Sequence, residues 1–531
     1  MSVGQGINRK RSSSIWQPLR IPLFRNLLLA NLVSDIGTFM QNVGAAWLMV
    51  SFRVGPAYVA LTQTAAALPF FLLAPIAGPA GDIVDRRKLV LSTEVWMLIA
   101  AIAIAVLAIG HAMSPWVLLG LTFALSAGDA FEAPTWRAIL PELVGKDELA
   151  AASALNGIEF NFARAVGPAL AGLVIAVAGV STAFVVNAIS FVGVLAVIAM
   201  WKRSAVAPRG PRENLGGAIV AGLRYVRFSP QIKAVLVRQG ASMFFASGLL
   251  ALLPSLAHSL SPSAIGYGIL LGAFGAGAVL GAIALQPLRS LWSVEAVVSG
   301  GIAIVAAGMI AMGTVRSLAA LLPVMLVAGA AWICFVSLTS ALMQTLTPDW
   351  VRARVLAMFL FVFQGSVAIG SAVWGALAQR VGIHSALHWA GLGAMASLGL
   401  AFNFRIPNAA ADLSPGIHAR IPAILEKTSA EDEAGPVLVT VEYTVLPARR
   451  EEFEKLMKRY RLTRRRDGAS RWEIFRDIEN SDRYFEVFLS PSWAEHLRQH
   501  ERETKSDEEL KNQIRSCIME DPTVRHLLYT S

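Results

Sequence analysis

The 531-residue chain has little charge, little cysteine and no nucleotide-binding loop. Asp, Glu, Lys and Arg make up 15% of its residues, whereas a typical soluble domain carries about 25%. This deficit excludes one large soluble globule, and a hydrophobic share of 55% excludes a disordered chain. Two cysteines, Cys334 and Cys517, are too few for a disulfide framework. A GxxxxGK(S/T) loop is missing, so direct coupling to ATP is not expected.

The charges that the chain does have gather near its C-terminus. Residues 426–531 hold 19 Lys and Arg and 22 Asp and Glu, half of all charged side chains in a fifth of the chain. The first 425 residues carry 27 Lys and Arg against 14 Asp and Glu, a net charge of +13. These cations lie between apolar stretches, where a membrane topology signal places them. We therefore expect the lipid bilayer, and not nucleic acid, as the partner of this part.

Twelve stretches are long and apolar enough to cross a bilayer as helices. A helix needs about 20 mostly apolar residues to span the ~30 Å hydrocarbon layer. Only helices fit, because unpaired backbone groups are too costly in lipid. The stretches are 26–51, 57–79, 89–110, 115–136, 156–178, 182–201, 232–257, 265–286, 294–313, 319–345, 355–378 and 384–403.

The placement of Lys and Arg predicts the orientation of these spans. With the N-terminus in the cytosol, 21 Lys and Arg fall in cytosolic segments and three, Arg53, Arg316 and Arg380, fall in outer loops. Such an excess is typical of the cytosolic side and predicts that both termini are cytosolic. The predicted parts are an N-terminal segment (1–25), a six-helix bundle (26–201), a cytosolic linker with an interfacial helix (202–231), a second six-helix bundle (232–405), a linker (406–435) and a cytosolic domain (436–531).

Two ladders of glycines indicate that the bundles are repeats. Both have a spacing of five and then seven residues, and they lie 203 residues apart. They are Gly167, Gly172 and Gly179 in span five and Gly370, Gly375 and Gly382 in span eleven. Small residues let helices approach closely in lipid, and transporters are commonly built from such repeats. The predicted helix-packing residues are Gly167, Pro168, Gly172, Gly370 and Gly375.

The loop after span two reads GPAGDIVDRRK over residues 78–88. It resembles the signature loop of the major facilitator superfamily, in which an acid and several bases follow a glycine. Ile83 and Asp85 depart from the usual arginine and glycine of that loop. Asp82 can cap a helix end, and Arg86 can pair with it in one state and release it in the other. The candidate gating residues are Gly78, Asp82, Asp85, Arg86 and Arg87; the alternative is a plain basic anchor with a turn.

Two further segments resemble one branch of that superfamily, the transmembrane secretion effectors, which include enterobactin exporters. Residues 31–41 (NLVSDIGTFMQ) are similar to the branch's first helix, and residues 161–168 (NFARAVGP) to its fifth. The resemblance covers nearly the whole chain. It implies an all-α membrane body of twelve helices in two six-helix bundles, with a small C-terminal α+β domain. It also implies a multi-pass protein of the bacterial inner membrane.

The function implied by the resemblance is secondary transport and not enzymatic catalysis. The expected cargo is a small molecule (a siderophore, drug or metabolite), exported in exchange for protons without a cofactor. An importer of the same fold is the first alternative, because the residues do not separate the two directions. A membrane-tethered enzyme acting through the C-terminal domain is the second.

Several ionisable residues fall inside the predicted spans, where a charge is costly and usually faces a cavity or a partner. Asp129 and Glu132 are three residues apart in one helix and so share a face. The candidates for proton coupling or for lining the cavity are Asp35, Asp129, Glu132 and Arg164. The alternative for each is a helix-packing ion pair. Glu94 and Arg238 are expected near the membrane interface, with their charged ends at the headgroups.

Residues 436–531 are predicted to alternate as β-α-β-β-α-β, a ferredoxin-like pattern. The segment resembles the antibiotic-biosynthesis monooxygenase fold, whose domains usually pair, and this implies a possible homodimer. His496 and His500 are four residues apart on one helix face. That spacing can hold a metal, but a solvated or dimer-contacting face is the preferred interpretation, so no metal site is expected.

Overall fold

Long helices make up most of the chain between Pro22 and Ser397 in the computed structural model. The structure describes residues 15–83, 85–145, 148–201, 215–408, 413 and 435–529. The first six long helices are α1 (Pro22–Ser51), α2 (Pro56–Ile83), α3 (Arg86–Ile109), α4 (Pro115–Leu143), α5 (Leu149–Ala178) and α6 (Val180–Met200). The second six are α8 (Pro230–Leu260), α9 (Ala264–Leu291), α10 (Val294–Thr314), α11 (Leu318–Thr345), α12 (Asp349–Val381) and α13 (Ile383–Ser397).

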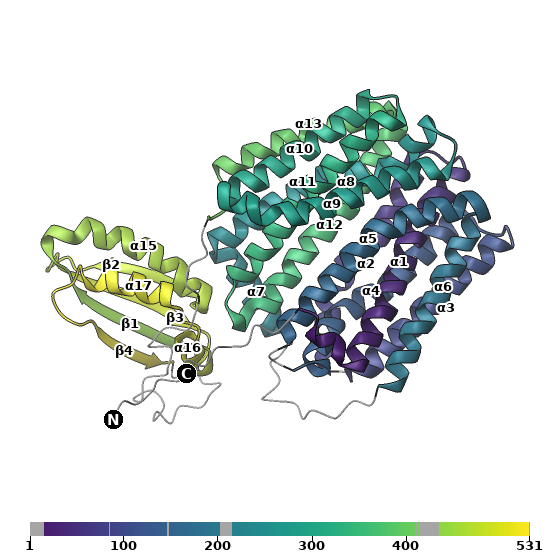
Figure 1. The fold of residues 1–531 in the computed structure, drawn as a ribbon. Helices are drawn as coiled ribbons and strands as arrows, with labels where there is room; N and C mark the ends of the chain where they lie inside the picture. The colour runs from purple at the N-terminus through teal and green to yellow at the C-terminus, as the bar shows by residue number, and fades with distance from the viewer. Residues whose placement is uncertain are drawn as a thin grey trace, which may run out of the picture. The chain divides into compact units, whose positions relative to one another are not determined.

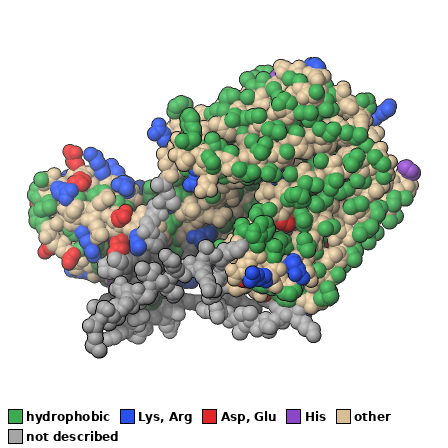
Figure 2. All heavy atoms as spheres, in the orientation of Figure 1, with side chains coloured by type: hydrophobic (Ala, Val, Ile, Leu, Met, Phe, Trp, Pro, Cys, Tyr) green, Lys and Arg blue, Asp and Glu red, His purple; other side chains and the backbone are tan. Residues whose placement is uncertain are grey.

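Eleven helices of the described residues are long and apolar enough to cross a membrane. The remaining long helix, α1, has 30 residues and packs against α5 and α6 like its neighbours. Its mean hydropathy is lower because polar residues such as Asn31, Asp35 and Gln41 interrupt its apolar sequence. Figure 2 shows a largely hydrophobic surface over the helices, with Lys and Arg side chains near their ends. The expected body of twelve spanning helices in two six-helix bundles is therefore confirmed.

The two glycine ladders end their helices in the same way. Gly179 follows α5 with a φ of +83°, and Gly382 follows α12 with a φ of +86°. A side chain is strained at such angles, whereas glycine adopts them readily. In each case the next helix begins at the following residue, so that α5 and α6, like α12 and α13, are joined by a single residue.

The C-terminal domain is an antiparallel sheet with helices on one face. Within residues 435–529, its strands are β1 (Val437–Thr444), β2 (Arg471–Arg476), β3 (Arg483–Ser490) and β4 (Thr523–Leu528), in the spatial order β2-β3-β1-β4. The helices are α15 (Arg450–Asp467), α16 (Trp493–Glu501) and α17 (Lys505–Arg515), so two helices stand where the sequence predicted one. Alternate residues of β1 pack under α15, as a half-buried strand requires. The ferredoxin-like prediction is confirmed.

Contacts divide the chain into two units, which we describe separately. The first comprises residues 1–209, 239–337 and 360–399, and the second comprises residues 210–238, 338–359 and 400–531. The second unit contains the predicted linker helix as α7 (Leu215–Phe228), together with the C-terminal domain. Of the predicted N-terminal segment and linkers, residues 1–14, 202–214, 409–412 and 414–434 lie outside the described residues.

Candidate functional site

Acidic side chains from four helices of the first unit lie close together, and one arginine lies beside one of them. Within the part of the chain that the structure describes, the cluster contains Asp35 (α1), Glu94 (α3), Asp129 and Glu132 (α4), and Glu159 and Arg164 (α5). Asp129 and Glu132 face the same way because they are separated by nearly one helical turn. We call this set the acid cluster.

The acid cluster contains two carboxyl pairs. The carboxyl groups of Asp35 and Glu159 lie close together, and Asp35 is within electrostatic reach of Arg164. The carboxyl groups of Glu94 and Glu132 also lie close together. Because ionised carboxylates only accept hydrogen bonds, a hydrogen bond within either pair requires a proton on one partner. Such pairs are suited to sharing a proton.

Two neighbours connect and orient these pairs. The Thr93 hydroxyl donates to Glu132 Oε2 at 3.2 Å. Asp129 interacts electrostatically with Asp35 and with Glu132, one member of each pair. Glu94 is 3% exposed, whereas Asp35, Asp129 and Glu132 are half-buried. The cluster thus extends from the buried Glu94 to three carboxyl groups that are partly exposed.

Arg164 is held in place by aromatic rings. Its guanidinium lies 4.9 Å from the centre of the Phe160 ring, and Phe39 of α1 lies 5.7 Å from the same ring. A Cβ atom added at Gly167 would lie 2.7 Å from Cβ of Phe39, so the glycine lets α1 and α5 approach at this level. Burying the flat face of an arginine against a ring stabilises its charge.

The sequence analysis identified four of the six members and missed Glu94 and Glu159. Glu94 was expected at the membrane interface, because only five residues separate it from the basic end of α3 at Lys88. That expectation is wrong, since Glu94 is buried against Glu132 of α4. Arg238 is also buried, at 2% exposed, and does not extend to the headgroups. Glu159 could have been identified from the sequence as a member of the cluster, because it is an acid inside a spanning helix, five residues before Arg164.

The loop between α2 and α3 connects three helices of the first bundle. Asp85 caps α3 by accepting from the Lys88 backbone N–H at 3.0 Å. Arg86 forms an ion pair with Glu142 at the end of α4 at 2.9 Å. Arg87 donates to the carbonyls of Ile198 and Ala199 at the end of α6, where a cation suits the helix dipole. Gly78 and Asp82 lie in α2, but their side chains are outside the described residues, as is the predicted pairing of Asp82 with Arg86.

The two bundles touch along two seams in the first unit. In the first seam, α5 packs on α9 (Figure 1). A Cβ added at Gly172 would lie 2.8 Å from the Gly268 Cα. In the second, a Cβ added at Gly375 of α12 would lie 2.4 Å from Cβ of Ala60 of α2. The Thr64 hydroxyl donates to the Ala368 carbonyl at 3.0 Å in the same seam.

Both seams lie toward the same ends of the helices. We call the ends at which α1 begins and α13 stops the terminal ends, and the opposite ends the far ends. Gly172 is near the far end of α5, and Gly375 is near the far end of α12. Trp47, also toward the far end of α1, lies with its ring 5.5 Å from that of His258 in α8 and 6.5 Å from that of Tyr267 in α9. The bundles therefore close against each other at the far ends.

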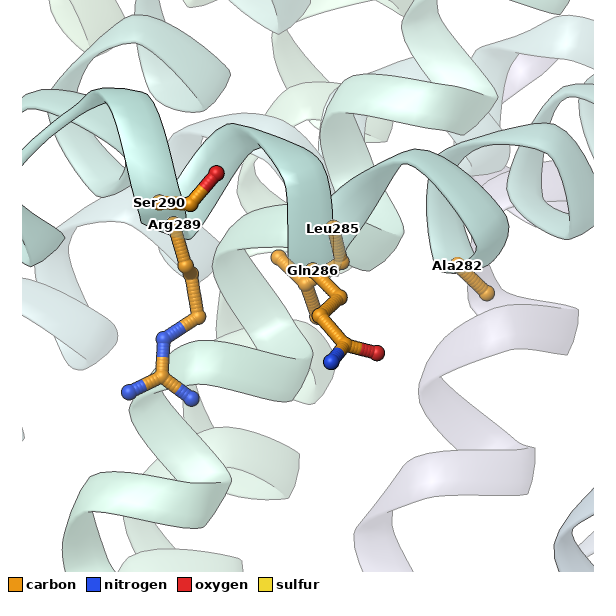
Figure 3. A pocket seen from close by; sticks show the side chains of 5 residues that line it. All are labelled: Ala282, Leu285, Gln286, Arg289 and Ser290. Atoms are coloured by element: carbon orange, nitrogen blue, oxygen red, sulfur yellow. The ribbon is translucent and has the colours of Figure 1, made fainter.

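At the terminal end of α9 the face that makes the seam is open. Gly268 and Gly272 contact α5, and the same face continues through Ala282, Gln286 and Arg289. These three residues line a hollow of about 420 Å³, into which their side chains project (Figure 3). On α5, Ile158 in the corresponding stretch is 52% exposed. The hollow lies on the terminal half of α9.

The C-terminal domain has a different kind of interior. His496 is 2% exposed and lies 5.1 Å from the ring of His500 and 4.9 Å from that of His526 on β4. The expectation of a solvated histidine face is therefore wrong, because α16 turns this face onto the sheet. Within the described residues, no three His, Cys, Asp or Glu are placed to hold a metal ion.

Two six-helix bundles that meet at the far ends, together with the acid cluster inside the first bundle, define a secondary transporter of the major facilitator fold. A solved structure of this fold, a bacterial homologue of the iron transporter ferroportin in an inward-facing state, matches with a TM-score of 0.57 and 15% identity, over 72% of this chain and 98% of that one. The chain belongs to the transmembrane secretion effector family, whose sequence pattern matches residues 13–531.

Two characterised relatives are transporters as well. The multidrug efflux pump Tap of Mycolicibacterium fortuitum is 24% identical over 372 residues, covering 68% of this chain and 90% of the pump. The enterobactin exporter EntS of Salmonella typhimurium is 27% identical over 371 residues, covering 67% of this chain and 86% of the exporter. The protein is thus a multi-pass membrane transporter for small-molecule cargo and not an enzyme.

Proposed function

We propose that this protein exports a small amphipathic molecule across the bacterial inner membrane in exchange for protons. The observation that carries the proposal is the acid cluster, in which the described residues bring five carboxyl groups together, with one arginine beside Asp35. An ionised carboxylate is costly at membrane depth. Most of these groups must therefore be protonated when the cluster is closed off from water, and they can lose protons when it is open.

The two carboxyl pairs supply a cycle. With the cluster open to the cytosol, Asp35 and Glu159 lose their shared proton, and Arg164 then neutralises Asp35. Cargo enters the same opening. After the bundles rock, protons from the other side return to the carboxyl groups and the cargo leaves. The reprotonated cluster carries little net charge, which favours the return of the empty transporter.

The distribution of cations supports a cytosolic opening. The bundles are closed at the far ends and open at the terminal ends, and the sequence places 21 Lys and Arg on the terminal side against three on the far side. Both termini are then cytosolic, and the structure faces inward. The loop of Asp85, Arg86 and Arg87 lies at these terminal ends, where it can act as a gate as the bundles rock.

Export, as opposed to import, is supported by the relatives, an efflux pump and an enterobactin exporter. A siderophore, drug or metabolite with both polar and apolar parts suits a site that places acids beside aromatic rings such as Phe160. We take enterobactin and the dye ethidium as trial cargoes for the test.

Inverted membrane vesicles provide the test, because an exporter loads them from outside. Uptake of a trial cargo should require an imposed proton gradient with an acidic lumen, and it should raise the pH of the lumen in proportion to the cargo moved, because protons leave as cargo enters. Uptake that persists after a protonophore collapses the gradient would contradict proton coupling. The natural cargo can then be identified as the metabolite that is present in the medium of the wild-type strain and missing from the medium of a strain in which the gene is deleted.

We also propose that the C-terminal domain mediates a homodimer through its open sheet face. The register places Leu489, Leu438 and Leu527 side by side across β3, β1 and β4, on the face opposite the helices. Phe475 on β2 is 55% exposed and Leu527 is 50% exposed. The leucine row is a partly exposed apolar strip, and apolar surface of this kind is typical of an interaction site. Replacing Phe475 and Leu527 by Asp should convert a dimer into a monomer in light scattering of the detergent-solubilised protein.

A further inference from the structure

We propose that the C-terminal domain binds the linker helix α7 and the α11–α12 turn of its own chain, and that this contact brakes the transport cycle. The inference rests on the chain being a transporter and not on proton coupling. All of the contacts that carry it lie in the second unit. They are an ion-pair hub at Glu495 and a row of arginines stacked on aromatic rings.

Glu495 of α16 is the hub. Its Oε1 accepts from Arg224 of α7 at 2.7 Å and from Arg502 at 2.8 Å. The side chains of Arg224 and Glu495 are 17% and 16% exposed, so water screens their attraction much less than it screens an exposed pair. One carboxylate thus joins a helix of the transporter to the core of the C-terminal domain.

Arginines of the domain cover the aromatic rings of the transporter side. The Arg502 guanidinium lies 4.5 Å from the ring centre of Trp350, in the first turn of α12. Arg466 lies 5.5 Å from Tyr225 of α7, and Arg465 lies 4.8 Å from Phe228. Each arrangement places a cation on the negative face of a ring, which is attractive.

The two transporter segments that the domain binds also contact each other. The rings of Tyr225 and Trp350 are 5.6 Å apart and nearly perpendicular. Tyr225 is 2% exposed, although α7 is a surface helix by composition. A Cβ added at Gly222 would lie 3.0 Å from Cβ of Arg354, so glycine is needed for this approach. Linker, turn and domain therefore form one packed block.

The domain presents this face already ordered. Arg466 is fixed from behind by ion pairs to Asp467 and Asp507, both at 2.8 Å. Asp507 is in turn held by the capping box of Thr504 at the start of α17. A face whose side chains are held before binding loses little entropy on docking. Docking against Tyr225 accounts for the low exposure of Arg466, whose side chain is 14% exposed.

The position of the block in the chain makes it a brake. Helix α7 is the connection between α6 and α8, and α8, α11 and α12 continue from the second unit into the first. Closing the terminal ends of the bundles requires movement of these same helix ends. A domain bound to α7 and to the start of α12 stabilises the arrangement seen here and opposes that closure.

Spin labels on the full chain in nanodiscs test both parts of the proposal. Labels at Leu223→Cys on α7 and Lys458→Cys on α15 report docking, and labels at Ser153→Cys on α5 and Ile283→Cys on α9 report the opening between the bundles. The native cysteines are buried and are not expected to react. Arg224→Glu should broaden the first distance distribution, at least double the fraction of molecules with closed terminal ends, and raise ethidium transport two- to fivefold.

Two controls separate docking from unfolding. Arg224→Lys retains the charge and should behave like the parent protein. Arg450→Glu makes the same charge reversal at the Arg450–Asp482 pair, away from α7, and should leave both distributions unchanged. Trp350→Ala should act like Arg224→Glu, and Trp350→Phe should not. A docking distance that stays sharp in Arg224→Glu and Trp350→Ala, or transport that is unchanged or slower when it broadens, would overturn the proposal.

Discussion

Buried charge is treated in opposite ways in the helical body and in the C-terminal domain. In the domain, Glu486 is fully buried and accepts from Arg464 at 3.0 Å, from the Tyr443 hydroxyl at 2.8 Å and from the Trp472 indole at 2.8 Å. In the body, Glu94 and Glu132 have each other and a threonine hydroxyl. Complete pairing fixes a structure, whereas acids without matching bases can exchange protons as their surroundings change.

The largest effect on transport is expected from changes in the acid cluster of the helical body. Asp35→Asn and Glu132→Gln keep the size of each side chain but remove a titrating group, so proton-driven uptake of a trial cargo should fall at least about tenfold. Expression and the melting temperature should stay near those of the parent. The measurement is proton-driven uptake into inverted vesicles, with cargo exchange at equal pH on both sides as the control. Normal driven uptake by both variants would remove the acid cluster from the coupling mechanism.

The matching change in the C-terminal domain should cost stability and leave the chemistry of transport alone. Glu486→Gln leaves the buried Arg464 without its counter-ion, which costs about 3–5 kcal/mol. Hydrogen exchange in β1 and β3 of the full chain should then rise sharply. If the C-terminal domain also brakes the transport cycle, the rate of transport should not fall when the domain is destabilised. Unchanged exchange would show that the arginine finds another partner.

Acid should weaken the domain because its histidines are held neutral. Burial, with the neighbouring His500 and His526, lowers the pKa of His496 to about 3, and burial beside Arg464 lowers the pKa of His500 to about 4. Both values lie below the ordinary 6.5, so the full stability is present above pH 6.5 and is lost as the pH falls toward 4. The loss should be about 1.4 kcal/mol per pH unit for each histidine.

Denaturant unfolding of the domain, followed by hydrogen exchange at pH 7.5 and pH 5, measures this slope. A His496→Leu and His500→Leu double variant should show a flatter pH dependence than the parent. An equal slope in the two proteins would assign the acid sensitivity to other groups.

The smallest effect on transport is expected at the ion pair of Arg86 and Glu142, where a charge of the helical body has a partner, as the charges of the C-terminal domain do. Arg86 and Glu142 form a partly exposed pair, and such a pair is worth about 1 kcal/mol or less. Glu142→Gln should therefore change the balance of conformations by about fivefold at most, and transport should slow without stopping. Kinetics of the trial cargo in vesicles would reveal this. A loss as complete as that of Asp35→Asn would give the loop a larger role than a gate.

The spans and the sheet could be predicted because their signals are local. A run of about 20 apolar residues identifies a spanning helix by itself, and alternation along residues 437–444 identifies a half-buried strand. Even α1 was found, although its mean hydropathy is lower than that of its neighbours. The strand order followed from the succession of elements.

The acid cluster was only partly predictable because it depends on contacts between helices. Asp129 and Glu132 are three residues apart, and the sequence alone places them on the same face of one helix. Glu94 looks interfacial when α3 is considered alone, and only its contact with α4 shows that it is buried. His496 was misjudged for the same reason, since the charged residues around it in sequence lie on the other faces of α16.

The polar composition of α1 has a consequence for biosynthesis. Its least apolar positions are covered by later helices: Gln41 accepts from Asn187 of α6 at 3.1 Å, and Gly44 lies against Phe184 of the same helix. When α1 leaves the ribosome, some 130 residues must still be made before these partners exist. The first segment to meet the translocon is therefore the one least able to settle in lipid alone, and it achieves a stable position only after α6 has been synthesised.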